Sequence, residues 1–380
     1  MTQNYRFGEI CDVLNGRAYK QNELLSSGKY PVLRVGNFFS SDRWYYSDME
    51  LPENKYCDNE DLLFAWSASF GPKIWDGGKV IYHYHIWKLV PDTSKADKYY
   101  LYYWLKHSVN RLTAGTHGSV MAHMTKGDME NQQIELPSLD VQKKVSSILK
   151  TLDDKIKLNN EINSNLFEQV KTLYYNMINS DCNHTSTKLS ELCDFQEGYV
   201  NPSQSHSEYF EGEIKWLRAV DINESFIINT SRTLSKQGFE SAGKSALLFK
   251  PDTIAISKSG TVGRLGIIAD YMCGNRAVIN ITPKDASMIT FIYSYLQSKQ
   301  AEFPDLAVGS VQKNLYVSVL ADLDVQLPDE KYLKIFSETT IPLYNTISNN
   351  CKECLELALI RDTLLPKLMS GEIDLSNISI

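Results

Sequence analysis

The sequence predicts an α+β protein: two mixed α/β domains in tandem repeat, separated by two long helices that form an antiparallel coiled coil. Three observations in the 380 residues support this fold class. Similar segments recur about 190 residues apart, a heptad pattern follows each copy, and β-branched segments alternate with aromatic helical ones. We therefore expect a first domain over 1–136, a helix over 137–180, a second domain over 181–328, and a second helix with a tail over 329–380.

The tandem repeat is visible in several short segments. "GEICDVLNGRAY" (8–19) resembles "SELCDFQEGYV" (190–200), and "VLRVGN" (32–37) resembles "WLRAVDIN" (216–223). Further on the offset is 191, where "DLLFAWSASFGPK" (61–73) lies over "DTIAISKSGTVGR" (252–264), pairing Asp61 with Asp252 and Lys73 with Arg264. Gly-Ser-Val followed by Leu-Pro also occurs in both copies. This period is too long for a short-unit solenoid, so the repeated unit is a whole domain with its helix.

Each domain combines strands with helices. Alternating and β-branched residues predict strands over 79–90 and 275–282. Aromatic residues at spacings of three and four predict helices over 96–112 and 288–300.

The heptads that follow each Leu-Pro predict the coiled coil. Asn159 and Asn350 fall at the same step of the two patterns, and a buried Asn costs stability while it fixes register. Pro342 should kink or restart the second helix near its beginning. An alternative is that each helix packs only on its own domain. The expected seam contains Leu149, Leu152, Ile156, Asn159, Leu166, Leu343, Ile347, Asn350, Leu357 and Leu364.

Composition excludes several classes of protein. No segment is as apolar as a membrane span, and the N-terminus has no signal-peptide pattern. The odd number of cysteines, seven, favours reduced thiols and a cytoplasmic location. The net charge is −7, with a balanced first half, so charge alone predicts no nucleic-acid partner.

The sequence contains no recognisable catalytic or metal motif. There is no Walker A motif, no Gly-rich cofactor loop between a strand and a helix, and no Asn/Asp-Pro-Pro-aromatic motif. "YHYHIW" places His83 and His85 on one strand face, where we expect packing or a surface contact because no third ligand is present. The sequence therefore indicates a non-catalytic binding protein.

The helical segments "LPSLDVQKKVSSILKTLDDKIKLNNEINSNL" (136–166) and "LIRDTLLPKLMSGEI" (359–373) resemble those of type I restriction–modification specificity subunits. "DLLFAWSASFGP", "SKSGTVG" and the repeated Gly-Ser-Val with Leu-Pro resemble the same family, and the resemblance covers nearly the whole chain. It implies two target recognition domains, each reading half of a split double-stranded DNA sequence. The helices would space the domains and dock two methyltransferase subunits that use S-adenosylmethionine. Motor–nuclease subunits that use ATP and Mg would complete the complex.

Two other functions remain open at this point. A stand-alone DNA-binding regulator would bind its site without partner subunits, and an assembly scaffold would show no sequence preference.

Candidate DNA contacts follow from polar residues in the repeated loops. Lys258 and Arg264 flank a loop with glycine, which suits contact with phosphate or guanine. The Gly and Ser of "GTHGSV" (115–120) would let backbone N–H groups approach a phosphate, although a tight turn explains them equally well. The candidates in the first domain are Arg34, Ser67, Ser69, Lys73, Thr116, His117 and Ser119. Those in the second are Arg218, Lys258, Ser259, Thr261, Arg264, Ser310, Gln312, Lys313 and Asn314.

Overall fold

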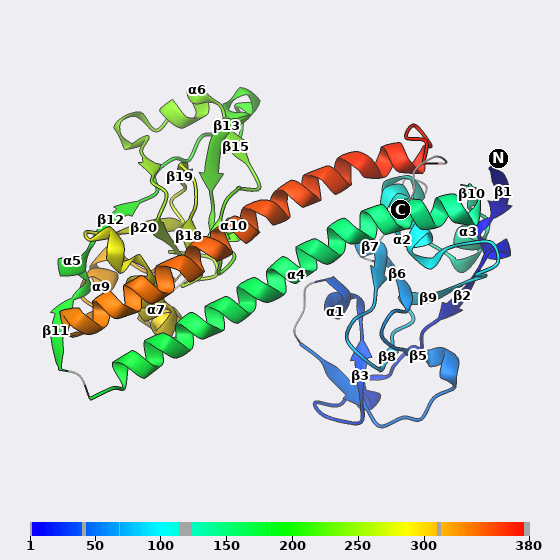
Figure 1. Cartoon of the computed structure of the whole chain (residues 1–380), viewed down its shortest axis with the longest axis horizontal. Coiled ribbons are helices and arrows are strands. Elements are labelled where there is room, and N and C mark those ends of the chain that lie inside the picture. The colour runs from blue at the N-terminus through cyan, green and yellow to red at the C-terminus, as the bar shows by residue number, and fades with distance from the viewer. Residues whose placement is uncertain are drawn as a thin grey trace. The chain divides into compact units, whose positions relative to one another are not determined.

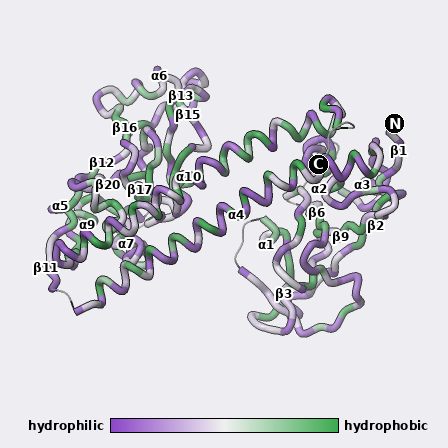
Figure 2. Tube along the Cα trace, in the orientation of Figure 1, coloured by the Kyte–Doolittle hydropathy of each residue, from purple (hydrophilic) through white to green (hydrophobic). Residues whose placement is uncertain are grey.

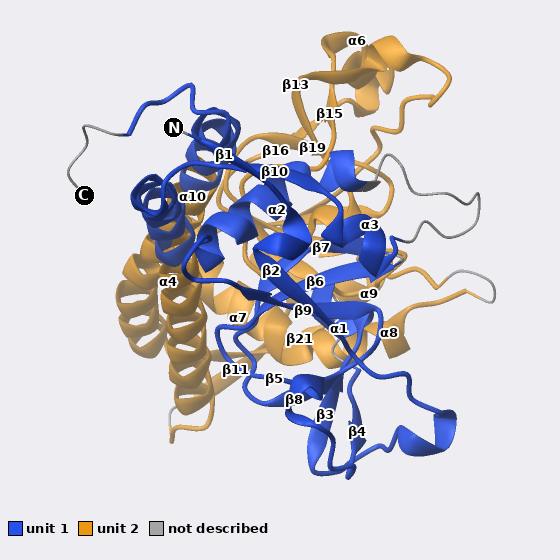
Figure 3. Ribbon diagram, turned by 90° about the vertical axis from the view of Figure 1, so that its right-hand side faces the viewer, with its two compact units in different colours: residues 1–155, 357–380 blue, residues 156–356 orange. Residues whose placement is uncertain are grey.

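The computed structural model describes residues 2–39, 43–67, 69–113, 124–181, 183–309 and 313–375. It contains two compact units (Figure 3). Unit 1 comprises Met1–Lys155 and Leu357–Ile380, and unit 2 comprises Ile156–Glu356. Each unit thus holds one α/β body together with part of each long helix.

The body of unit 1 is built on two four-stranded sheets, ordered β2-β9-β6-β7 and β4-β3-β8-β5, and a small sheet of β1 and β10. Its main core lies between the first sheet and helix α2, where Phe64 and Trp87 stack with ring centroids 6.1 Å apart. The elements are β1 (Gln3–Arg6), β2 (Cys11–Asn15), β3 (Tyr30–Leu33), α1 (Val35–Phe39), β4 (Tyr45–Ser47), β5 (Tyr56–Cys57), β6 (Leu62–Ser67), β7 (Ser69–Ile74), β8 (Val80–Tyr82), β9 (Ile86–Pro91), α2 (Lys98–Thr113), α3 (Lys126–Glu130) and β10 (Gln133–Leu136).

Unit 2 repeats this plan with sheets ordered β12-β20-β17-β18-β14 and β15-β13-β19-β16, and a small sheet of β11 and β21. Helix α7 supplies Phe291, Ile292 and Leu296 to a core shared with the isoleucines of the five-stranded sheet. The elements are β11 (His184–Lys188), α5 (Leu189–Leu192), β12 (Cys193–Glu197), β13 (Phe210–Leu217), β14 (Phe226–Ile227), β15 (Thr233–Leu234), α6 (Lys236–Glu240), β16 (Leu248–Phe249), β17 (Thr253–Ser257), β18 (Leu265–Ile268), β19 (Met272–Gly274), β20 (Val278–Pro283), α7 (Ile289–Lys299), α8 (Phe303–Leu306), α9 (Val317–Ala321) and β21 (Asp324–Pro328).

The predicted elements are present, with one refinement. The expected helices correspond to α2 and α7, and the expected strand over 275–282 corresponds to β20. The segment 79–90 forms two strands, β8 and β9, because a turn over 83–85 interrupts it. In the described part of the chain, no helix combines the length and the apolar character that a membrane crossing needs.

Strand register corrects the repeat alignment by one residue. Leu62 pairs with Leu89 in unit 1, and Ile254 pairs with Ile281 in unit 2, which gives an offset of 192. Glu60 and Asp252, at that offset, both have a positive φ, of 70° and 58°. Asp252 therefore corresponds to Glu60, and its pairing with Asp61 was wrong. A side-chain pattern alone could not detect a slip that only the hydrogen-bond ladder records.

The same ladder changes the partner of Arg264. The backbone N–H of Ser257 donates to the Arg264 carbonyl oxygen over 2.9 Å. Ser257 occupies the place of Ala65, which pairs with Gly71. Arg264 therefore corresponds to Gly71 and not to Lys73.

Figure 1 shows two long helices, α4 (Leu139–Ile178) and α10 (Glu330–Met369), of 40 residues each. Each contributes to both units (Figure 3). In unit 1, Asp153 of α4 pairs with Arg361 of α10 over 2.6 Å. In unit 2, Asn350 Nδ2 donates to Asn163 Oδ1 over 2.8 Å, and the ring of Tyr174 lies 6.3 Å from that of Phe336. Residue numbers rise along one helix as they fall along the other, so the helices pair antiparallel. Figure 2 shows the alternation of hydrophobic and hydrophilic residues along both.

All ten residues of the expected seam are buried or half-buried. Asn159 and Asn350 do not bond to each other: Asn159 Nδ2 donates to Glu353 Oε2 over 2.6 Å, while Asn350 donates to Asn163. The helices also pack on the bodies of their units, since Leu149 belongs to the core of unit 1 and Ile347 to that of unit 2. The helices therefore pair with each other as expected, and the alternative that each packs only on its own domain is wrong.

Helix α10 continues through Pro342, so the helix does not restart there, which was one of the two effects expected of this proline. Proline removes one hydrogen bond to the carbonyl four residues earlier, here that of Glu338. Both residues are on the exposed face of the helix, where water can satisfy that carbonyl.

Candidate nucleic-acid interface

In unit 2, the ends of four adjacent strands meet at one edge of the five-stranded sheet. Glu197 at the end of β12 pairs with Ile279 of β20, and Ser257 at the end of β17 pairs with Val278. The first residue of β18, Leu265, pairs with Ile256 of β17. The loops that extend from these ends therefore lie together. We call the segments 197–199, 258–264 and 275–277 the strand-end surface of unit 2.

Unit 1 has the equivalent edge. Asn15 at the end of β2 pairs with Trp87, Ala65 of β6 pairs with Ile86, and Ser67 pairs with Ser69 across the β6–β7 hairpin. The strand-end surface of unit 1 accordingly comprises 15–17, residues 66, 67 and 69, and 83–85. Each copy is a set of loops at the rim of a rigid sheet, which is a common location for binding residues.

The structure brings most of the predicted residues of unit 2 to this surface. Lys258, Ser259, Thr261 and Arg264 lie in the β17–β18 loop. Lys313 and Asn314 lie beside this loop, because the next residue, Leu315, donates its N–H to the Lys258 carbonyl over 2.9 Å. Arg218 leaves β13 beside the 275–277 turn, as Asn275 N–H donates to the Leu217 carbonyl over 3.0 Å.

In unit 1, Ser67 and Ser69 lie on the hairpin of the strand-end surface, and Arg34 leaves β3 beside the 83–85 turn. Lys73 lies apart from it, further along β7, where its ammonium group is 5.5 Å from the Trp75 ring. The remaining candidates, Thr116, His117, Ser119, Ser310 and Gln312, lie outside the described residues.

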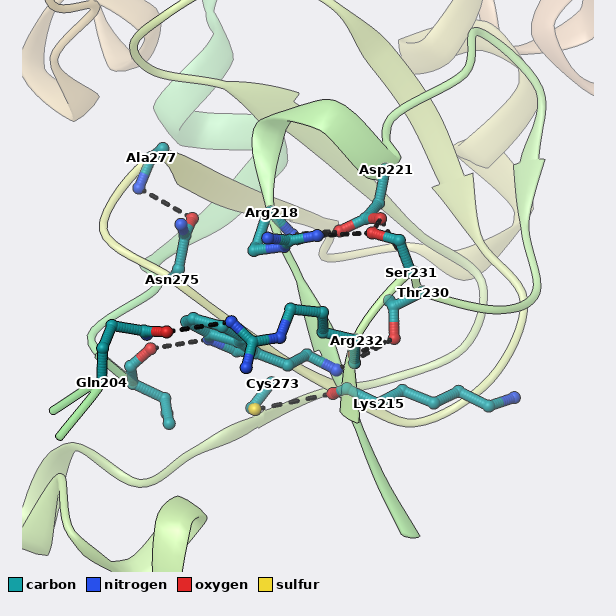
Figure 4. Close-up of polar contacts among 12 residues, drawn as sticks. Gln204, Lys215, Arg218, Asp221, Thr230, Ser231, Arg232, Cys273, Asn275 and Ala277 are labelled. Atoms are coloured by element: carbon teal, nitrogen blue, oxygen red, sulfur yellow. Dashed lines mark hydrogen bonds and ion pairs between the residues drawn. The ribbon is translucent and has the colours of Figure 1, made fainter. Parts of the chain in front are cut away.

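Two of the predicted basic residues are held by internal partners. The Lys258 ammonium group lies 2.9 Å from both carboxylate oxygens of Glu197, and its side chain is only 15% exposed. Arg218 donates to Ser231 Oγ over 2.6 Å and lies 3.5 Å from Asp221 (Figure 4). These two cations therefore stabilise the frame of the surface more than they offer charge to a ligand.

Other arginines make no ion pair with a described residue. Within the described ranges, the guanidinium groups of Arg264 and Arg276 have no hydrogen bond or ion pair, and Arg276 is exposed. Arg34 is also exposed, and its guanidinium carbon lies 5.0 Å from the centre of the Tyr45 ring. A basic group on an exposed loop is suited to phosphate or base-edge contacts.

An aromatic and histidine cluster surrounds the 83–85 turn in unit 1. Trp66 Nε1 donates to the Tyr84 carbonyl over 2.8 Å, and its ring lies 5.2 Å from that of His85 in a T-shaped arrangement. Burial, together with smaller contributions from His85 and Arg34, lowers the pKa of His83 to about 4. His83 is thus neutral near pH 7. No group of three or more His, Cys, Asp or Glu is placed to bind a metal in the part of the chain described.

Sequence reasoning missed several residues of this surface. Arg17, Trp66, Tyr199, Asn275 and Arg276 were not among the candidates, and Tyr84 was seen only as part of a strand. The segments "YHYHIW" and "GNRAVI" occupy equivalent places after β8 and β19. An alignment at the offset of 192 would have identified them.

Comparisons with known proteins agree with this organisation. A family model described as type I restriction modification DNA specificity domain matches residues 2–168 and again 183–353. The chain is 28% identical over 176 residues to the HindI type I restriction enzyme specificity subunit of Haemophilus influenzae, covering 45% of this chain and 38% of that protein. It is 23% identical over 402 residues to the MjaVIII specificity subunit of Methanocaldococcus jannaschii, covering 98% of this chain and 93% of that protein.

A solved structure shows the same fold. It is the S subunit of a type I restriction–modification system from M. genitalium, which is 16% identical, with a TM-score of 0.62 and coverage of 97% of this chain and 96% of the other. The two family matches take up most of the chain and coincide with its two repeats. The chain therefore carries two DNA specificity domains and belongs to the family of type I restriction–modification specificity subunits.

Proposed function

We propose that this chain is the non-catalytic DNA-recognition subunit of a type I restriction–modification complex, in which each unit reads one half of a bipartite target. The observation that carries the proposal is the duplicated strand-end surface: two copies of one backbone frame with different exposed side chains. A protein that reads two different half-sites needs this combination.

Association with other subunits would explain how a chain with a net negative charge binds DNA. Its net charge of −7 is unfavourable for a stand-alone DNA-binding protein, because phosphate neutralisation supplies much of the affinity. Partner subunits would supply that neutralisation, while this chain provides base contacts. The charge thus favours the subunit over the stand-alone regulator, and the duplicated surface favours it over an assembly scaffold.

The long helices are the proposed docking sites for two methyltransferase subunits, and motor–nuclease subunits would join them. S-adenosylmethionine, ATP and Mg would be bound by these partners. Exposed apolar side chains on the helices support the docking role, because water-exposed leucine and isoleucine are suited to an interface. They are Leu158, Ile162, Leu355, Leu359 and Ile360.

Domain exchange tests the function. The chain is co-expressed with the methyltransferase subunit proposed as its partner, and methylated bases are mapped across the genome. Replacing residues 1–136 with the equivalent domain of a relative should change one half of the methylated motif and leave the other half unchanged. A change in both halves, or in neither, would contradict independent reading by the two units.

The purified chain alone should show no methylation, nuclease or ATPase activity. Turnover that stays with the chain through purification, and that is lost in a variant of the chain itself, would overturn the non-catalytic assignment.

A further inference from the structure

The turn between β8 and β9 in unit 1 and the turn between β19 and β20 in unit 2 share one backbone frame. His83 N–H donates to the Leu33 carbonyl over 2.9 Å, and Asn275 N–H donates to the Leu217 carbonyl over 3.0 Å. Each turn is closed by the first residue of the next strand, which donates back to the carbonyl of His83 or Asn275 over 2.9 and 3.1 Å. The two turns therefore present their side chains from equivalent positions.

A glycine lies directly beneath each turn. A Cβ atom at Gly16 would lie 2.3 Å from the His83 carbonyl oxygen, and one at Gly198 would lie 2.2 Å from that of Asn275. No other residue fits at that distance. The chain directly after β2 and β12 thus passes so close to its turn that only glycine fits, and this restricts the backbone of the turn. A rigid loop loses little conformational entropy when it binds.

The side chains on this common frame differ completely. Unit 1 presents His83, Tyr84 and His85, and unit 2 presents Asn275, Arg276 and Ala277. The adjoining position also differs, since Trp66 and Lys258 make the same backbone bonds: their N–H groups donate to the carbonyls of His85 and Ala277 over 3.1 and 2.7 Å. Contacts to phosphate carry no sequence information, so they give no reason for such divergence.

In unit 2, Arg276 is the side chain of the turn that is available to a ligand. Lys258 is held by Glu197, and Arg218 by Asp221 and Ser231. Asn275 Oδ1 accepts the N–H of Ala277 over 3.0 Å, which fixes its side chain within the turn (Figure 4). Arg276 is exposed beside Tyr199, whose side chain is 49% exposed. An arginine so presented can make the bidentate contact to guanine O6 and N7.

We propose that these two turns are the base-reading elements of the two units, and that Arg276 reads a guanine in the half-site of unit 2. In unit 1, the Tyr84 turn occupies the same place and reads a different base step. This inference rests on the proposed function, and it assigns specificity to positions that loop composition did not indicate.

The test is methylation mapping with Arg276→Ala in the complex of the full chain and its methyltransferase partners. One guanine position in the second half-site should become degenerate, with preference for guanine falling at least about fivefold, as expected for loss of a bidentate contact. The first half-site should stay unchanged. Lys244→Ala, which removes an exposed charge elsewhere in unit 2, is the matched control and should leave the motif intact.

Two outcomes would overturn the inference. One is an unchanged motif at full efficiency, and the other is a uniform loss of methylation with the motif intact, which would make Arg276 a phosphate contact. Methylation of a bipartite motif by the complex without any substitution would uphold the proposed function in either case. Absence of any bipartite motif in that complex would instead contradict the function itself.

A triple variant, H83N/Y84R/H85A, gives the reciprocal test in unit 1. It transplants the unit 2 side chains onto the same frame and should change the first half-site alone. Efficient methylation of the original first half-site by this variant would exclude the turn as its reader.

Discussion

At the scale of single residues, the strand-end surfaces contain two kinds of charged side chain. The side chains of Lys258 and Arg218 are bonded to neighbours and hold the loops in place, whereas the guanidinium groups of Arg276 and Arg264 make no hydrogen bond or ion pair with a described residue. His83 differs from both kinds, because its lowered pKa keeps it neutral at neutral pH. The local environment thus determines which residues of similar type position the surface and which are available to a ligand.

The histidine predicts a pH dependence of unit 1. The pKa of His83 is about 4 in the folded protein, below its ordinary value of 6.5, so the unfolded chain takes up this proton first as pH falls. The free energy of unfolding should therefore decrease as pH falls from about 6.5 towards 4. His83→Asn, which copies Asn275 of unit 2, should weaken this dependence.

Hydrogen exchange of the β8 amides at several pH values measures the effect in unit 1 directly. The control is His206→Asn, which alters an exposed histidine of unit 2. Equal pH slopes for the unmodified protein and His83→Asn would show that another group is responsible.

At the scale of elements, the helix pair combines an apolar seam with polar contacts at its centre. Asn350 donates to Asn163, and Asn159 donates to Glu353. Asp153 accepts one hydrogen bond from Arg361 and another, over 2.7 Å, from the Tyr103 hydroxyl. Such partly buried polar pairs add little net stability. Their hydrogen bonds form in one alignment of the two helices, so these contacts fix the register of the pairing.

The apolar seam predicts the cost of a buried charge. Ile347 is fully buried in the core of unit 2, so Ile347→Asp should destabilise that unit by about 3 kcal/mol or more through lost packing and an unpaired carboxylate. Thermal unfolding should show an earlier transition for unit 2, while unit 1 retains its protection in hydrogen exchange. Asn349→Asp on the exposed side of the helix should be nearly neutral. A similar loss in both variants would mean that burial is not the cause.

At the scale of the whole molecule, each unit is completed by both helices. The boundary between the units falls at Lys155 in α4 and at Glu356 in α10. A change in one helix alone would therefore disturb its antiparallel register with the other. A change of equal length in both would preserve it.

This arrangement predicts how the DNA spacing responds to helix length, if the helices determine the gap between half-sites as proposed. Seven residues inserted after Lys155 and seven after Glu356 keep the heptad phase and add about 10 Å to each helix. The gap between the two half-sites should widen by up to about three base pairs, at ~3.4 Å per base pair, while both half-sites stay the same.

The matched control is the insertion in α4 alone, which should impair methylation because the helices lose register. Methylation mapping distinguishes the outcomes. An unchanged gap with the double insertion would mean that another element determines the spacing, and altered half-sites would mean that a helix itself reads bases.

The sequence by itself determined the tandem repeat, the heptad helices and their order, because these depend on periodic patterns along the chain. The paired heptads were sufficient to place Leu149 and Ile347 on buried faces. The resemblance to specificity subunits relied on the same periodic segments, and the two family matches confirm it.

Only the tertiary structure decided which residues form the strand-end surfaces. Lys258 and Arg276 are 18 positions apart in sequence, and only the pairing of β17 with β20 brings them to one edge. Sequence reasoning favoured Lys258 because it flanks a loop with glycine, but its bond to Glu197, 61 positions away, is a long-range contact. Composition of a loop indicates that it can bind, whereas the availability of each side chain depends on neighbours that the fold supplies.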